Sequence, residues 1–273
     1  MVSNWERTGT IIKETFALAG KDKSLFIPPF LSMVFGIVFA AVAMVIIFTG
    51  NVVGGGNIPA AFFLFALLIL FVGYLASAVF SAALSWMTLE VVHGKDTTLG
   101  SGLARAVKKF GSLALYALVS LLVMLFVSQL RDNKKDNLIM SIIRNLLAGV
   151  IEKTWDIASH FMLPAIALTD KGFVGAAKEL PVLLKHLPET LVGGFAFDFV
   201  VRWVYLLDII LALLVGFLFF AISPILGILV GLGLLFLLVV ATYVFYDFVK
   251  SVYFTMMYIE LHPELKSKRA LKK

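Results

Sequence analysis

Six long apolar stretches dominate the chain and decide what it can fold into. They cover residues 25–49, 58–90, 111–130, 138–168, 189–222 and 225–259. Each reaches or exceeds the ~20 residues that a helix needs to cross ~30 Å of hydrocarbon. Because lipid offers the backbone no hydrogen-bond partners, a helix is the form in which such a stretch satisfies its own polar groups. The sequence therefore predicts an all-α, polytopic transmembrane helical bundle of about six spans.

The composition of the chain supports one membrane domain. Of the 273 residues, 61% are hydrophobic, whereas soluble domains are closer to half apolar. Six spans leave no room for a separate soluble domain, so we predict a single integral membrane domain over residues 1–273. The net charge of +6 does not indicate a nucleic-acid partner, because the charges lie in short connections between apolar stretches. The chain has no cysteine, which excludes disulfides, thiolate catalysis and zinc thiolate sites.

The basic residues predict an orientation. Lysine and arginine collect on the cytoplasmic side of a membrane protein. Here alternate connections are basic, and the loops at 50–58 and at Ser223 have neither residue. We therefore predict a multi-pass protein of the cell membrane with both termini in the cytoplasm. Arg131, Lys134 and Lys135 are exceptions, because they fall on the predicted outside.

Three short segments combine apolar residues at helical spacing with basic residues on the other face. They begin near Trp5, Leu99 and Phe173, and each precedes a pair of apolar stretches. Such helices can lie in the membrane interface with their basic faces toward anionic headgroups. We therefore expect three cytoplasmic amphipathic helices that bind the lipid bilayer through its anionic lipid headgroups.

The second of these segments leads to a more specific expectation. Leu103, Val107 and Phe110 share its apolar face. Burying such side chains contributes ~1.5–3 kcal/mol each. We therefore expect this apolar face to hold the segment in place, and the charge of Arg105 to matter less.

The segments and the pairs that follow them suggest a three-fold internal repeat, over residues 1–90, 97–168 and 172–260. Glycine, lysine and aspartate occur together beside each amphipathic segment. The alternative is that glycine and lysine mark loops in any membrane protein, and the sequence leaves both interpretations open.

Three groups of residues form landmarks along the chain. They are Trp5 with Lys21-Asp22-Lys23-Ser24-Leu25-Phe26, Pro28 and Ser32; Ser81-Ala82-Ala83-Leu84 with Gly94, Thr98-Leu99-Gly100, Gly102-Leu103 and Ala106; and Met162-Leu163-Pro164 with Gly175-Ala176-Ala177-Lys178. Together they resemble an uncharacterised prokaryotic family of six-helix integral membrane proteins, a domain of unknown function. Glu179 departs from the family, which often has serine there. The resemblance implies a six-helix bundle with cytoplasmic amphipathic helices and carries over no catalytic or binding residue. A looser similarity of layout is to sulfate-permease-like membrane proteins.

The stretch 138–168 differs from the others because it is charged. Glu152, Asp156 and His160 recur at every fourth residue, so they project from one helical face. If the helix ends near Thr169, this face lies at membrane depth. Ionisable groups there are costly and normally face a bundle interior or a wet cavity. One interpretation is a polar path for a proton, an ion or a small solute.

The alternative interpretation of the same charges is structural. Lys153 can neutralise Asp156, which lies three residues further along the helix, and Arg202 or Lys250 can pair with the remaining acids. In the fifth stretch, Asp198 and Arg202 are spaced i, i+4, so we expect them to form an ion pair.

No hydrolase or phosphate-loop motif occurs, so we predict a non-enzymatic protein with no catalytic residue and no cofactor. One histidine and two carboxylates on one helical face are too few for a metal site. The first interpretation is a transporter or channel for a small solute or ion. Its candidate binding residues are Glu152, Asp156, His160, Asp198 and Arg202.

The second interpretation is a membrane-organising or partner-binding scaffold, which would use the basic amphipathic helices on the cytoplasmic face. A small helical bundle can also form a homo-oligomer. Gly227, Gly231 and Gly233 would permit the close helix contact that this requires.

Overall fold

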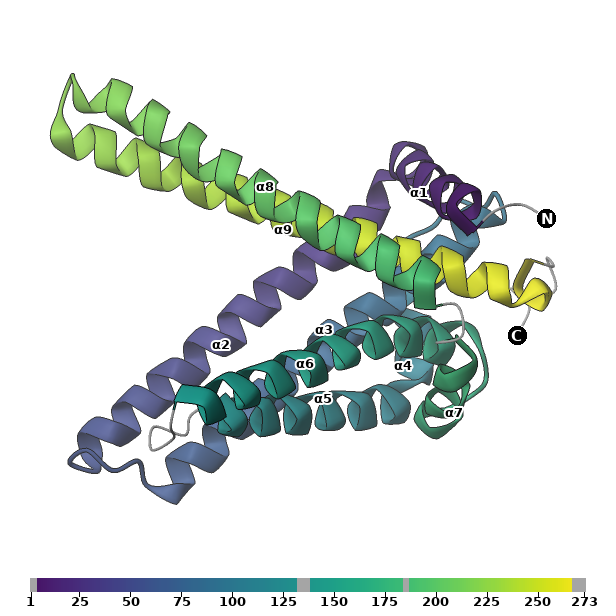
Figure 1. Ribbon diagram of the computed structural model, residues 1–273, viewed down its shortest axis with the longest axis horizontal. Coiled ribbons are helices and arrows are strands. Elements are labelled where there is room, and N and C mark those ends of the chain that lie inside the picture. Colours follow the sequence, from purple (N-terminus) through teal and green to yellow (C-terminus); the bar gives the residue numbers. More distant parts are fainter. Residues whose placement is uncertain (1–3, 132–137, 184–186, 267–273) are drawn as a thin grey trace.

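The computed structural model describes residues 4–131, 138–183 and 187–266, and within these ranges the chain is helical and has no strand. The helices are α1 (Asn4–Lys21), α2 (Ile27–Val53), α3 (Ala60–Val92), α4 (Leu99–Lys108), α5 (Phe110–Arg131), α6 (Leu138–Leu168), α7 (Phe173–Leu183), α8 (Leu187–Phe220) and α9 (Pro224–Leu261). Figure 1 shows α8 and α9 as a long hairpin that diverges from α2. The predicted all-α fold is confirmed.

Local sequence signals set several helix boundaries. Pro28 and Pro29 stand in the first turn of α2, where a missing backbone N–H costs little. Thr98 and Ser101 form a capping box at the start of α4. Gly55 and Gly56 adopt positive φ angles of 60° and 98° in the turn between α2 and α3, a conformation that glycine adopts without strain.

Five helical segments in the described part of the chain are long and apolar enough to cross a membrane. They are Lys23–Val53, Ala60–Val92, Phe110–Arg131, Phe197–Phe220 and Pro224–Leu261. The chain therefore has the character of an integral membrane protein. With 31 residues, α6 is also long enough, but its charged residues separate it from these five.

The buried core lies at the end of the molecule where the N- and C-termini are found. It is formed mainly by residues 82–89 of α3, 157–168 of α6 and 248–259 of α9. Figure 1 shows α1, α4 and α7 gathered at this end. At the opposite end, near the turn between α8 and α9, the apolar side chains are exposed. Phe217 and Ile222 there are both 75% exposed. Open apolar surface of this kind suits contact with lipid rather than with water.

A carboxylate fastens the end of α3 to the start of α4. Glu90 accepts hydrogen bonds from Trp86 Nε1 at 3.1 Å and from the hydroxyls of Thr97 and Ser101, both at 2.6 Å. Charge-assisted bonds of this kind are stronger than neutral ones. Glu90 thereby joins the last turn of α3 to the first turn of α4.

Arg105 connects α4 to the end of α6. Its side chain is buried, and its Nε donates to the backbone oxygen of Ala167 at 2.8 Å. Its Nη2 donates to the backbone oxygen of Thr169 at 3.4 Å, and its guanidinium lies 4.8 Å from the centre of the Trp86 ring. The last carbonyls of a helix have no partner within the helix. Arg105 supplies a partner for the Ala167 carbonyl in the last turn of α6 and for the Thr169 carbonyl directly after it.

The buried face of α4 therefore differs from the predicted one. Gly102, Arg105 and Ala106 are buried, whereas Val107 is 63% and Phe110 51% exposed. Of the three apolar residues expected to hold the segment, only Leu103 packs against the core. The apolar pattern of this segment did not indicate the contacts of Arg105, because one helix alone does not show that the carbonyls at the end of α6 lie beside it.

Glu179 ties α7 to α9. It forms an ion pair with Lys171 and accepts a hydrogen bond from Tyr258 at 3.0 Å. Burial alone would raise the pKa of Glu179, but the hydrogen bonds from Lys171 and Tyr258 together lower it below its ordinary value. The carboxylate of Glu179 is therefore stabilised in its charged form.

The α8–α9 hairpin has a seam in which the two backbones touch. A Cβ atom at Gly227 would lie 2.6 Å from the backbone of Phe220, and one at Gly216 would lie 3.1 Å from Gly231 Cα. Gly227 and Gly231, expected to allow contact between copies of the chain, thus permit close contact within it. Gly233 faces open space.

We predict that Arg105→Ala will lower the stability of the protein by roughly 2 kcal/mol, because it removes charge-assisted hydrogen bonds to the end of α6. Lys108→Ala, on the exposed face of the same helix, should change the stability by less than about 0.5 kcal/mol. Thermal unfolding in detergent measures both variants. Equal melting temperatures for the two would contradict the assigned role of Arg105.

Candidate functional site

Charged residues of α6, α8 and α9 form one network of ion pairs. Lys250 Nζ of α9 lies 3.1 and 3.0 Å from the two carboxylate oxygens of Asp156 and 3.5 Å from Asp198 Oδ1. Lys153 Nζ lies 3.1 Å from Asp156 Oδ2 and also binds Asp198. Two lysines and two aspartates therefore neutralise one another across three helices.

Tyr246 and His160 also contact this network. Tyr246 donates a hydrogen bond to Asp198 and accepts one from Lys250 Nζ at 2.9 Å. His160 Nδ1 lies 2.6 Å from the backbone oxygen of Asp156. The Lys250 side chain is only 6% exposed, and a buried charge is tolerated only when it is paired and hydrogen-bonded. Lys250 meets both conditions.

The structure brings together three of the five predicted site residues, Asp156, His160 and Asp198. The expected ion pair between Asp198 and Arg202 does not form in the described part of the chain, because Lys153, Tyr246 and Lys250 hold Asp198 instead. The suggested pairing of Lys153 with Asp156 is present.

Glu152 stands apart from this network. It forms an ion pair with Arg131 at the end of α5. Both side chains are about half exposed, and a pair of that kind contributes little to stability. Arg131 was one of the basic residues that disagreed with the predicted orientation, and the structure gives it an acidic partner.

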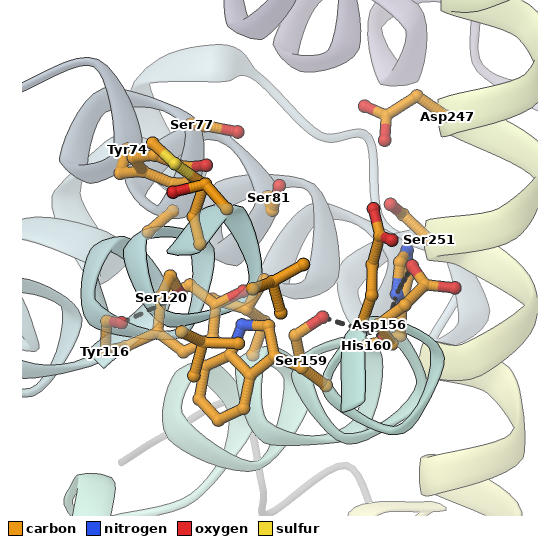
Figure 2. Close-up of a pocket in the computed structure, with 18 of the residues that line it drawn as sticks. Tyr74, Ser77, Ser81, Tyr116, Ser120, Asp156, Ser159, His160, Asp247 and Ser251 are labelled. Carbon is orange, nitrogen blue, oxygen red and sulfur yellow. Dashed lines mark hydrogen bonds and ion pairs between the residues drawn. The ribbon is translucent and has the colours of Figure 1, made fainter. Parts of the chain in front are cut away.

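A polar cavity of about 630 Å³ lies between α3, α5, α6 and α9. Its wall carries eight hydroxyl side chains: Tyr74, Ser77, Ser81, Tyr116, Ser120, Ser128, Ser159 and Ser251. Its ionisable residues are Arg131, Glu152, Asp156, His160 and Asp247. Figure 2 shows these groups coming from all four helices around one space. The charged face of α6 predicts one wall of such a path, whereas the polar residues of the other three helices were not predicted to line it.

The polar groups of each wall repeat at one helical turn, which places them on one face. The pairs are Ser77 and Ser81 in α3, Tyr116 and Ser120 in α5, Asp156 and His160 in α6, and Asp247 and Ser251 in α9. A single pair of this kind in an apolar stretch is a weak signal. Its recurrence in three further helices was the sequence feature that could have revealed the cavity.

Asp247 is distinct among the acids of this cavity. In the described part of the chain, no hydrogen bond or ion pair holds its carboxylate. Figure 2 shows the Asp247 carboxyl pointing away from α9 toward the space between the helices. The cavity therefore has one carboxylate that is available to a ligand.

A second cavity, of about 520 Å³, lies on the other side of the charged network. Asp198 and Arg202 line it together with Lys153, Lys250 and Tyr246. Glu152 and Asp156 line both cavities. The charged face of α6 is thus a wall between two polar spaces, and Arg202 reaches only the smaller one.

No protein-family model matches the chain, and no curated protein matches its sequence. The resemblance of its three landmarks to the six-helix membrane-protein family therefore stays a prediction. Within the described residues, no group of three or more histidine, aspartate or glutamate side chains could hold a metal ion.

We predict that Asp156→Asn will lower the stability of the protein by about 2 kcal/mol. The loss should be below the 3–5 kcal/mol of a fully buried pair, because Asp156 retains some exposure. The substitution keeps the shape of the side chain but leaves the buried Lys250 ammonium with a single close carboxylate. Adding Lys250→Gln should restore most of the loss. Melting temperatures in detergent report both effects.

Glu152→Gln is the matched control, one helical turn away on the same face. Because Glu152 and Arg131 are exposed, this change should cost less than about 1 kcal/mol. If Asp156→Asn is as stable as this control, the network does not hold the helices together.

Proposed function

We propose that the protein is a six-span membrane transporter that binds a small polar solute in the hydroxyl-lined cavity. The observation that carries this proposal is the cavity itself, with eight hydroxyls and the Asp247 carboxylate among long apolar helices. Its volume of about 630 Å³ falls within the ~300–1,000 Å³ of typical ligand pockets. Hydroxyls both donate and accept hydrogen bonds, so they can replace the water around a polar solute.

The contacts of α6 support its place in the bilayer as a span in addition to the five apolar helices. Intramembrane charges normally face the bundle interior and pair with one another. Lys153 and Asp156 do so with Asp198 and Lys250, and Glu152 pairs with Arg131. The charges that separate α6 from the five apolar helices are therefore compatible with a place in the bilayer.

The charged network supplies the barrier of the proposed path. The two polar cavities share Glu152 and Asp156 as lining residues. A solute that passes from one cavity to the other must separate Asp156 from Lys250. While these charges are paired, they block the path between the two cavities. Opening the path requires α9 to move relative to α6.

A scaffold function is the second candidate, and exposed apolar side chains on the short helices favour it. Phe16 of α1, Val107 of α4 and Val174 of α7 are 46%, 63% and 59% exposed, near basic residues of the same helices. Side chains of this kind can insert into a lipid surface. A scaffold would work equally well with the central cavity filled, whereas a transporter would not.

We predict that tags on the N- and C-termini will both be cytoplasmic, as six spans and the basic connections require. Protease protection in sealed vesicles tests this directly. A span count of five, without α6, would place the two tags on opposite sides. A tag in the turn at Gly55 should be accessible from the outside only and serves as the internal control.

The natural absence of cysteine allows a test of the cavity. We predict that Ser77→Cys and Ser251→Cys will react with a membrane-impermeant thiol reagent, because a transport cavity is open to water in at least one state. Leu213→Cys, on a 68% exposed apolar position of α8, should be shielded by lipid and stay unreacted. Cavity cysteines as unreactive as the Leu213 control would end the transport proposal.

A further inference from the structure

An apolar groove lies beside the polar cavity. It has a volume of about 780 Å³ and is bounded by α2, α3 and α9. Ile37 and Phe236 lie on its two sides and are 52% and 64% exposed. The groove is therefore open along its length to the surroundings of the helices, which in a bilayer are lipid tails. Figure 1 shows α2 and α9 parting in this region.

The groove and the polar cavity are contiguous. Tyr74, Ser77 and Met124 line both of them. At the junction, the hydroxyls of Ser32 and Ser77 lie 2.9 Å apart and mark where the lining turns polar. Along α9 the groove runs from Leu232 to Tyr243, which is about 17 Å of helix. One elongated molecule can occupy both spaces.

The two spaces differ sharply in chemistry. The groove is apolar apart from a few hydroxyls near the junction. In the cavity and its charged wall, Arg131 offsets Glu152, and the two lysines offset Asp156 and Asp198. The carboxylate of Asp247 has no such partner among the described side chains. An occupant that complements both spaces has a hydrocarbon tail and a positively charged head.

We propose that the solute is a cationic amphiphile, a long-chain ammonium compound, which reaches the cavity sideways from the bilayer. This inference rests on the proposed transport function and specifies its substrate class. The tail lies in the groove between α2, α3 and α9. The ammonium head lies in the cavity, where it pairs with Asp247 and donates to serine hydroxyls. Burial of the tail supplies affinity, and the single free carboxylate selects the sign of the head group.

A photoreactive alkylamine tests this proposal. The probe is a long-chain primary amine with a diazirine near its methyl end, added to the protein in phosphatidylcholine vesicles. We expect crosslinks, located by mass spectrometry, to concentrate on groove segments such as 33–40 and 232–243. Crosslinks spread evenly over the exposed faces of α2, α3, α8 and α9 would overturn the proposal.

Two glycines provide a matched pair of variants. A Cβ atom at Gly36 or Gly233 would meet nothing within 4 Å, so both positions accept a larger side chain. Gly36 lines the groove and Gly233 does not. Gly36→Leu should reduce groove labelling roughly tenfold, about the effect of losing two buried methylenes. Gly233→Leu should leave it unchanged. Equal labelling of both variants would contradict the groove assignment.

The role of Asp247 is tested with a second probe, the alcohol of the same chain length. Asp247→Asn should weaken labelling by the amine and leave labelling by the alcohol as it is. If Asp247→Asn affects neither probe, or both equally, the carboxylate does not select a cationic head and the proposal fails.

A final measurement separates this inference from the proposed function. Short, tail-free tetramethylammonium can be tested for protection of Ser251→Cys against the thiol reagent. If it protects this cysteine while the alkylamine fails to label the groove, the solute is a water-soluble cation and only the amphiphile inference falls. If Ser251→Cys never reacts, the transport function falls as well.

Discussion

The ammonium group of Lys250, held between two carboxylates, is the interaction on which the arrangement of the helices depends. An ammonium group that is almost fully buried needs carboxylates beside it, because an isolated charge away from water costs several kcal/mol. The carboxylates come from α6 and α8, so both helices must meet α9 at this level. Tyr246 accepts a hydrogen bond from Lys250, and Lys153 forms an ion pair with Asp198. The positions of the two polar cavities on either side then follow from this junction.

The helices themselves could be predicted closely because their signals are local. The apolar stretch 138–168 coincides with α6, and the stretch 225–259 lies within α9. The short basic segments became α1, α4 and α7. Length, apolar periodicity and flanking glycine or proline act over a few residues, so a single sequence shows them. The three-fold repeat and the family resemblance remain predictions.

Contacts between residues that lie far apart in the sequence could not be predicted as well. Spacing within one helix suggested Asp198 with Arg202, whereas the structure joins Asp198 to Lys153, which is 45 positions away. The contacts of Arg105 were not predicted for the same reason, because its hydrogen-bond partners lie at the end of α6. The same reason applies to the serine-lined cavity, which exists only when four helices with modest polar faces pack together. A charged stripe such as Glu152, Asp156 and His160 indicates where a site lies. The residues that other helices contribute to the site can be identified only from the fold.

The glycine seam of the α8–α9 hairpin has a consequence for how the chain is made. Gly216, Gly227 and Gly231 let the two backbones touch in the half of the hairpin nearest its turn, and the atoms in contact there all belong to α8 and α9. Such a hairpin can settle as a pair as soon as both of its helices have left the ribosome and entered the bilayer. The other half of the hairpin carries Asp198 and Lys250, and Lys250 also pairs with Asp156 on a helix that is synthesised earlier. A lateral docking step inside the membrane would then follow, in which Lys250 of the preformed hairpin pairs with Asp156 of α6.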